Sequence, residues 1–144
     1  MAQSLEPYTL QVEWPLAQLD LRAGNFEEAA SSLGRLAEHI PAMRATIYDA
    51  AWRAGMPPAL IIHRVVPRKA EAAGEYLCYL ARRGEWPQII PAYRALVPPH
   101  EKAPPAEMLQ YVAMRLSRSG RDVEGRQFVA LVHQGQVPRQ DPTK

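Results

Sequence analysis

The chain has 144 residues, 47% of them apolar and 22% charged, a balance that excludes an intrinsically disordered protein. A net charge of +2 is too small to indicate nucleic-acid binding by itself, and no apolar stretch is as long as a membrane helix. A single cysteine excludes an internal disulfide.

The first segment is ambiguous. Before Pro15, apolar residues alternate with polar ones at Tyr8, Leu10, Val12 and Trp14. Such alternation is typical of an extended segment, yet the same residues also fit a turn of helix. We therefore expect an N-terminal arm over residues 1–10 and leave its conformation open.

A short pattern, Arg-x-Gly, then recurs four times along the chain. Its glycines lie 31, 29 and 36 residues apart. Each glycine follows one apolar helical pattern and precedes another, which predicts a left-handed glycine that ends a helix. The arginine then lies in the last turn, where a cation favours the negative end of the helix dipole. The four glycines are Gly24, Gly55, Gly84 and Gly120.

Helical periodicity on both sides of each glycine predicts antiparallel hairpins in series. The stripe is clearest after Gly24, where Phe26, Leu33 and Ala37 share one face. The predicted fold is all-α, a right-handed solenoid of four hairpins in a single domain over residues 11–134, followed by a tail over 135–144. The hairpins are expected at about 11–40, 42–66, 70–98 and 105–134, with prolines in or near the connections.

The first hairpin resembles the tetratricopeptide repeat family. It carries small residues at the two helix-crossing positions, glycine at the turn, an aromatic after it and a closing proline, namely Ala17, Ala29, Gly24, Phe26 and Pro41. The resemblance covers about residues 11–134 and implies a protein-binding module. Departures such as Tyr48 and Leu77 at crossing positions imply an irregular superhelix.

A second resemblance concerns the middle of the chain. The runs Trp52-Arg53-Ala54-Gly55 and Tyr79-Leu80-Ala81-Arg82-Arg83-Gly84 are similar to helical-repeat tails of bacterial membrane proteins of the O-antigen ligase type. That likeness implies an extracytoplasmic or extracellular domain detached from a membrane parent. Without such a parent, the expected compartment is the cytoplasm.

Catalytic patterns are not found in the sequence. His39, His63, His100 and His133 are too far apart for metal-ligand spacing, and each turn glycine is isolated rather than part of a phosphate loop. Cys78 lies among apolar residues, which does not favour a thiolate. We expect neither an enzyme nor a bound cofactor or metal.

Carrying over the positions of the repeat family defines a concave groove. These positions are Gln18, Leu21, Asp49, Trp52, Gln110 and Met114. Neither lysine nor arginine is among them, so a peptide held there is expected to be apolar or neutral.

The two ends of the stack favour self-assembly. The last helix contains Phe128-Val129-Ala130-Leu131-Val132, five apolar residues that cannot all face one neighbouring helix. Residues 1–50 hold 3 basic and 7 acidic groups, whereas residues 51–144 hold 14 and 8, so unlike ends attract. Head-to-tail contacts that do not close produce filaments. The expected interface is Tyr8, Leu10, Val12, Trp14, Phe128, Leu131 and Val132.

Three functional hypotheses remain. Head-to-tail self-assembly leads, unless residues 135–144 or the Tyr8 arm fold back over the apolar run within one chain. The second is a monomeric adaptor that binds a partner peptide in the concave groove. The third is a weak anion or nucleic-acid binder that uses the arginine strip Arg115, Arg118, Arg121 and Arg126, which lacks the interleaved aromatics that stack on bases.

Overall fold

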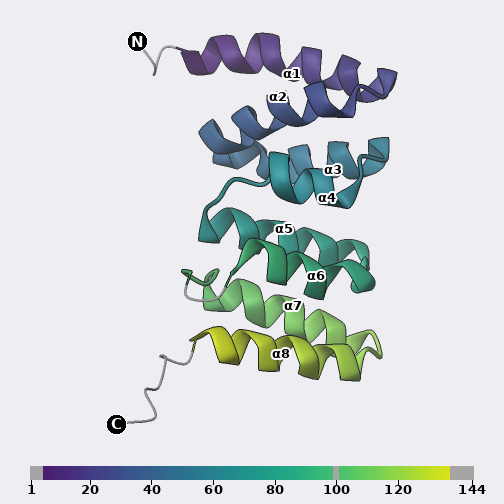
Figure 1. The fold of residues 1–144 in the computed structure, drawn as a ribbon, viewed down its shortest axis with the longest axis vertical. Coiled ribbons are helices and arrows are strands. Elements are labelled where there is room, and N and C mark those ends of the chain that lie inside the picture. The colour runs from purple at the N-terminus through teal and green to yellow at the C-terminus, as the bar shows by residue number, and fades with distance from the viewer. Residues whose placement is uncertain (1–4, 99–100, 137–144) are drawn as a thin grey trace.

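The computed structural model describes residues 5–98 and 101–136, and every regular element in those ranges is helical (Figure 1). The predicted all-α class is therefore confirmed for this part of the chain. The longer helices are α1 (Leu5–Ala23), α2 (Phe26–His39), α3 (Arg44–Ala54), α5 (Ala70–Arg83), α6 (Trp86–Leu96), α7 (Ala106–Arg118) and α8 (Asp122–Gln136). Between α3 and α5 the chain forms only the short α4 (Pro58–Leu60) and a π-helical turn, Ile61–Val65.

The four turn glycines have the left-handed conformation that the sequence predicts, with φ between 76° and 87°. Gly55 caps α3, and its amide donates to carbonyl oxygens of the last turn; Gly84 does the same for α5. The helix boundaries therefore follow directly from the spacing of the Arg-x-Gly pattern.

The first helix corrects one expectation. α1 begins at Leu5 and continues through Pro15, so the extended alternative for residues 5–14 is wrong. Pro15 has no amide hydrogen to donate within the helix, yet the helix continues on both sides of it. Tyr8 and Leu10 belong to this helix by their backbone, and their side chains lie outside the described residues.

The helices follow one another in chain order along the long axis of the molecule, with α1 and α8 at opposite ends (Figure 1). Consecutive helices pack against each other in the pairs α1 and α2, α5 and α6, and α7 and α8. In addition, α3 contacts α1, α5 contacts α3, and α7 contacts α5. The odd-numbered helices thus form a continuous row.

A single hydrophobic core runs along this stack from Ala17 to Phe128. Ala17 and Ala29, which the family resemblance places where α1 and α2 cross, are both fully buried. A second close approach occurs at Gly34, where a Cβ would collide with the backbone carbonyl oxygen of Arg64. The π-helical turn therefore packs directly on α2.

None of the helices in the described ranges combines the length and the apolar character needed to cross a membrane.

Candidate interaction surfaces

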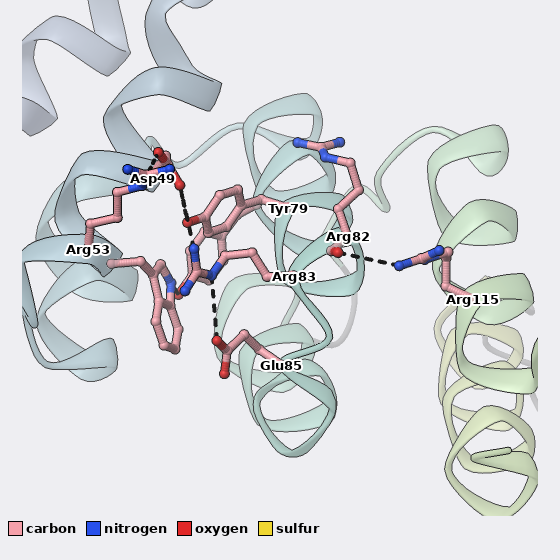
Figure 2. A network of polar contacts seen from close by, with 9 residues as sticks. Asp49, Arg53, Tyr79, Arg82, Arg83, Glu85 and Arg115 are labelled. Atoms are coloured by element: carbon pink, nitrogen blue, oxygen red, sulfur yellow. Dashed lines mark hydrogen bonds and ion pairs between the residues drawn. The ribbon is translucent and has the colours of Figure 1, made fainter. Parts of the chain in front are cut away.

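Asp49, a predicted groove residue, is the centre of a polar network between α3 and α5 (Figure 2). Its carboxylate accepts a hydrogen bond from the Tyr79 hydroxyl at 2.9 Å. Arg53 Nε lies 2.9 Å from its other oxygen, and Arg83 Nη1 lies 3.6 Å from the first. The charge of Asp49 is therefore balanced within the chain.

Trp52, the second groove residue of this region, is also held by intramolecular contacts. Its indole Nε1 donates to the Tyr76 hydroxyl at 3.0 Å. The Arg83 guanidinium lies 6.0 Å from the centre of the Trp52 ring and 5.8 Å from that of Tyr79, a cation–π arrangement. Burial raises the pKa of Tyr76 to about 12, although the hydrogen bond from Trp52 acts in the opposite direction. The Tyr76 hydroxyl thus stays protonated at neutral pH.

Arginine side chains lie beside the groove position Asp49, although no predicted groove residue is itself a cation. Two shallow concavities, of about 420 and 410 Å³, adjoin the network and share Ala45 and Arg82 as lining residues. Arg82 forms no ion pair with another described residue, and Figure 2 shows its side chain directed away from the Asp49 network. Arg83 lines one of the two concavities. A neutral or apolar peptide would therefore meet arginine side chains here.

The other groove residues do not extend this surface. Leu21 is buried in the core and Gln18 is half-buried on α1. Gln110 and Met114 are exposed on α7. The six groove residues are thus distributed over the first helix, the Asp49 network and the last hairpin.

Intramolecular contacts engage two of the four arginines of the predicted strip, Arg115 and Arg121. Arg115 donates to the backbone carbonyl oxygens of Ala81 and Arg82, both at 3.3 Å from Nη2. Arg121 lies 3.9 Å from the carboxylate of Glu124. Arg118 and Arg126 remain as the exposed members without an ion pair to another described residue.

In the apolar run of α8, the structure corrects one proposed interface residue. Phe128 is fully buried and packs edge-to-face on Tyr93, with ring centres 5.4 Å apart, so it belongs to the core and not to an exposed interface. Leu131 and Val132 are half-buried and pack against the same core. Val129 is 52% exposed and is the large side chain of the run that faces outward.

At the opposite end of the stack, α1 exposes two leucines that the sequence analysis did not single out. Leu16 is 51% exposed and Leu19 is 56% exposed, three residues apart on one face of the helix. Trp14 is half-buried and packs against the core, and Val12 is half-buried. In a helix, Leu16 and Leu19 lie on the face opposite Ala17 and Leu21, which are buried. The sequence therefore predicts that the two leucines are exposed only once α1 is assigned as a helix.

The large apolar residues that are exposed lie toward the ends of the molecule. Among the described residues they are Leu16 and Leu19 on α1, Met114 on α7, and Val123 and Val129 on α8. The described parts of α2 to α6 contribute none. Among the described residues, large apolar side chains exposed to solvent are thus confined to the first helix and the last hairpin.

A groove between α7 and α8 adjoins Val129. Its volume is about 210 Å³, and its lining is predominantly apolar. Ala106, Gln110 and Ala113 of α7 and Val129, Val132 and His133 of α8 line it. The groove therefore combines two residues of the expected assembly interface, Phe128 and Val132, with Gln110 of the expected concave groove.

The part of the chain that the structure describes contains no cluster of side chains that could hold a metal ion. Three or more histidine, cysteine or acidic side chains do not come together there. Burial raises the pKa of the Cys78 thiol, which donates to the Met108 carbonyl oxygen at 3.6 Å. A raised thiol pKa is the opposite of what a nucleophilic cysteine requires.

Comparison of the chain with protein-family models, with curated proteins and with solved structures gave no match. The resemblance to tetratricopeptide repeats therefore depends on the residues of this sequence alone. The function of the chain is therefore inferred from the surfaces described above.

Proposed function

We propose that this chain is a right-handed, tetratricopeptide-like solenoid of four hairpins that acts as a non-catalytic scaffold and assembles head-to-tail with copies of itself. The observation that carries the proposal is the position of the exposed apolar side chains. Leu16 and Leu19 lie on the first helix, and Val123 and Val129 lie on the last.

A stack of helical hairpins buries each hairpin against its neighbours, so its two end faces have no neighbouring helix among the described residues. Soluble repeat proteins normally finish with a polar outer face at both ends. Here both end helices carry valine or leucine side chains that are more than half exposed. Contact between copies would remove that apolar area from water, which favours association.

Unlike ends also carry unlike charge. Residues 1–50 have four more acidic than basic groups, whereas residues 51–144 have six more basic than acidic groups. Contact between the N-terminal third of one copy and the remainder of another therefore pairs regions of opposite net charge. When two copies associate through two different surfaces, the pair still has one free surface of each kind. Association therefore does not stop at the dimer.

The adaptor hypothesis ranks second because its central residues are already engaged. Asp49 is paired with Arg53 and accepts from Tyr79, and Trp52 donates to Tyr76. A peptide in this groove would have to compete with those contacts. The end faces need no such rearrangement.

A double substitution tests the proposal. Leu16→Glu with Leu19→Glu places two charges on the outer face of α1 without changing a buried residue. Burial of a whole leucine side chain contributes about 1.5–3 kcal/mol, and about half of each leucine is already buried, so loss of both weakens association by roughly 10- to 100-fold. We expect size-exclusion chromatography with light scattering to give large assemblies for the unmodified chain and monomers for the double variant.

Met114→Glu is the matched control, since Met114 is a 37% exposed apolar residue of the predicted concave groove. It should assemble as the unmodified chain does. Assembly that survives the α1 substitutions but is lost with Met114→Glu would place the contact on the concave groove and contradict head-to-tail association.

A further inference from the structure

The row of odd-numbered helices ends at α7 with an unoccupied position. Each earlier member contacts the next one in the row, α1 with α3, α3 with α5, and α5 with α7. The structure also shows how closely such neighbours fit: a Cβ at Gly74 of α5 would collide with Met108 of α7, and Arg115 of α7 donates to Ala81 of α5. Among the described residues, nothing makes the corresponding contact on the far side of α7.

The groove of about 210 Å³ lies at that unoccupied position, between α7 and α8. Its α7 wall includes Ala106 and Ala113, whose small side chains let another helix approach closely. Its α8 wall includes Val129, which is more than half exposed. An amphipathic helix fits such a groove through apolar residues three and four positions apart.

One described helix presents such an apolar edge to solvent. On α1, Leu16 and Leu19 are three residues apart and mostly exposed, and Val12 lies one turn before Leu16. α1 ends the odd-numbered row opposite α7, and its contact in the row is with α3 on one side only. The free edge of α1 and the free groove beside α7 are therefore complementary ends of one row.

Charge supports the same pairing. Asp20 on α1 is half-buried and forms no ion pair with another described residue. On α8, Arg126 is exposed, lacks an ion pair within the described ranges, and lines a second concavity that shares Val129 and His133 with the groove; Arg118 on α7 is exposed and likewise lacks an ion pair there. Placing α1 next to α7 and α8 brings an acidic group toward a basic surface.

We propose that α1 of a second copy occupies the groove between α7 and α8, as the next odd-numbered helix of the row, with Leu16 and Leu19 against Ala113 and Val129. The inference rests on the proposed function and specifies its contact. A row continued in this way adds one chain after another in the same direction and gives an open filament.

The test uses two variants that block different ends. Leu19→Glu blocks the edge of α1, and Val129→Glu blocks the groove; both positions are mostly exposed, and circular dichroism checks that each variant is folded. Because only the exposed half of each side chain is left to bury, each variant alone should associate roughly 10-fold more weakly than the unmodified chain and be monomeric at concentrations where that chain assembles. An equimolar mixture should form a heterodimer and nothing larger, because one intact α1 edge meets one intact groove.

Gln127→Glu is the control, since Gln127 is an exposed polar residue of α8 that does not line the groove. It should assemble as the unmodified chain does. If Val129→Glu alone assembles like the unmodified chain, or the mixture stays monomeric, the groove does not receive α1 and the inference is overturned while self-assembly stands. If the unmodified chain is itself monomeric at every concentration, the proposed function fails and the inference with it.

Discussion

Gly34 shows how a single hydrogen atom in place of a side chain can position two distant segments. It lies on α2, and an added Cβ would collide with the carbonyl oxygen of Arg64 in the π-helical turn. The same approach lets Arg64 reach Glu27 at 3.0 Å and Ser31 at 2.7 Å. The turn packs on α2 because no side chain at Gly34 separates them.

We expect Gly34→Ala to lower the free energy of unfolding by about 1–3 kcal/mol, because backbone atoms must move to admit the methyl group. Urea denaturation measures the loss. Gly120→Ala is the control, since an added Cβ there meets no atom within 4 Å and only the left-handed backbone opposes it. A variant at Gly34 as stable as the unmodified chain would contradict the close approach.

Tyr76 connects stability to alkaline pH. Burial raises its pKa to about 12, above the ordinary value of about 10 for tyrosine, and burial also raises the pKa of Tyr48. The folded chain thus holds these protons more tightly than the unfolded chain does. The resulting stabilisation is complete below pH about 10 and is lost as pH rises from about 10 toward about 12.

We expect the free energy of unfolding to fall over that pH interval and to fall less steeply in Tyr76→Phe. The variant also loses the acceptor for Trp52, a cost of about 1 kcal/mol that applies at every pH. Urea denaturation at several pH values separates the constant cost from the slope. Equal slopes in the two proteins would exclude Tyr76 as a source of the pH dependence.

Among the elements, α8 depends on Phe128 for its attachment to the rest of the molecule. The ring is fully buried against Tyr93 of α6. We expect Phe128→Ala to lower the free energy of unfolding by about 3–5 kcal/mol, because it leaves a cavity in the core. Val129→Ala, one residue along, should change it far less, as its side chain is half exposed. Chemical denaturation of both variants measures the contrast, and equal losses would contradict the orientation of α8.

The elements also differ in how far the sequence predicts them. The Arg-x-Gly spacing predicts the turns because a left-handed glycine acts within one turn of helix. Phe128-Val129-Ala130-Leu131-Val132 carries no such local signal, since five consecutive apolar residues leave the buried face of a helix undetermined. The contact of Gly34 with Arg64 joins residues 30 positions apart, which no local pattern encodes. Leu16 and Leu19 can be recognised as exposed residues on one helix face only after α1 is known to continue through Pro15.

At the scale of the whole molecule, we expect two different end surfaces to associate, so that every assembly keeps one free surface of each kind. Sedimentation velocity of the unmodified chain over a dilution series tests this most directly. We expect the weight-average sedimentation coefficient to keep rising with concentration, without a plateau at the dimer, and electron microscopy of the most concentrated sample to show filaments. A coefficient that stays at the monomer value throughout, or that levels off at the dimer, would contradict head-to-tail assembly.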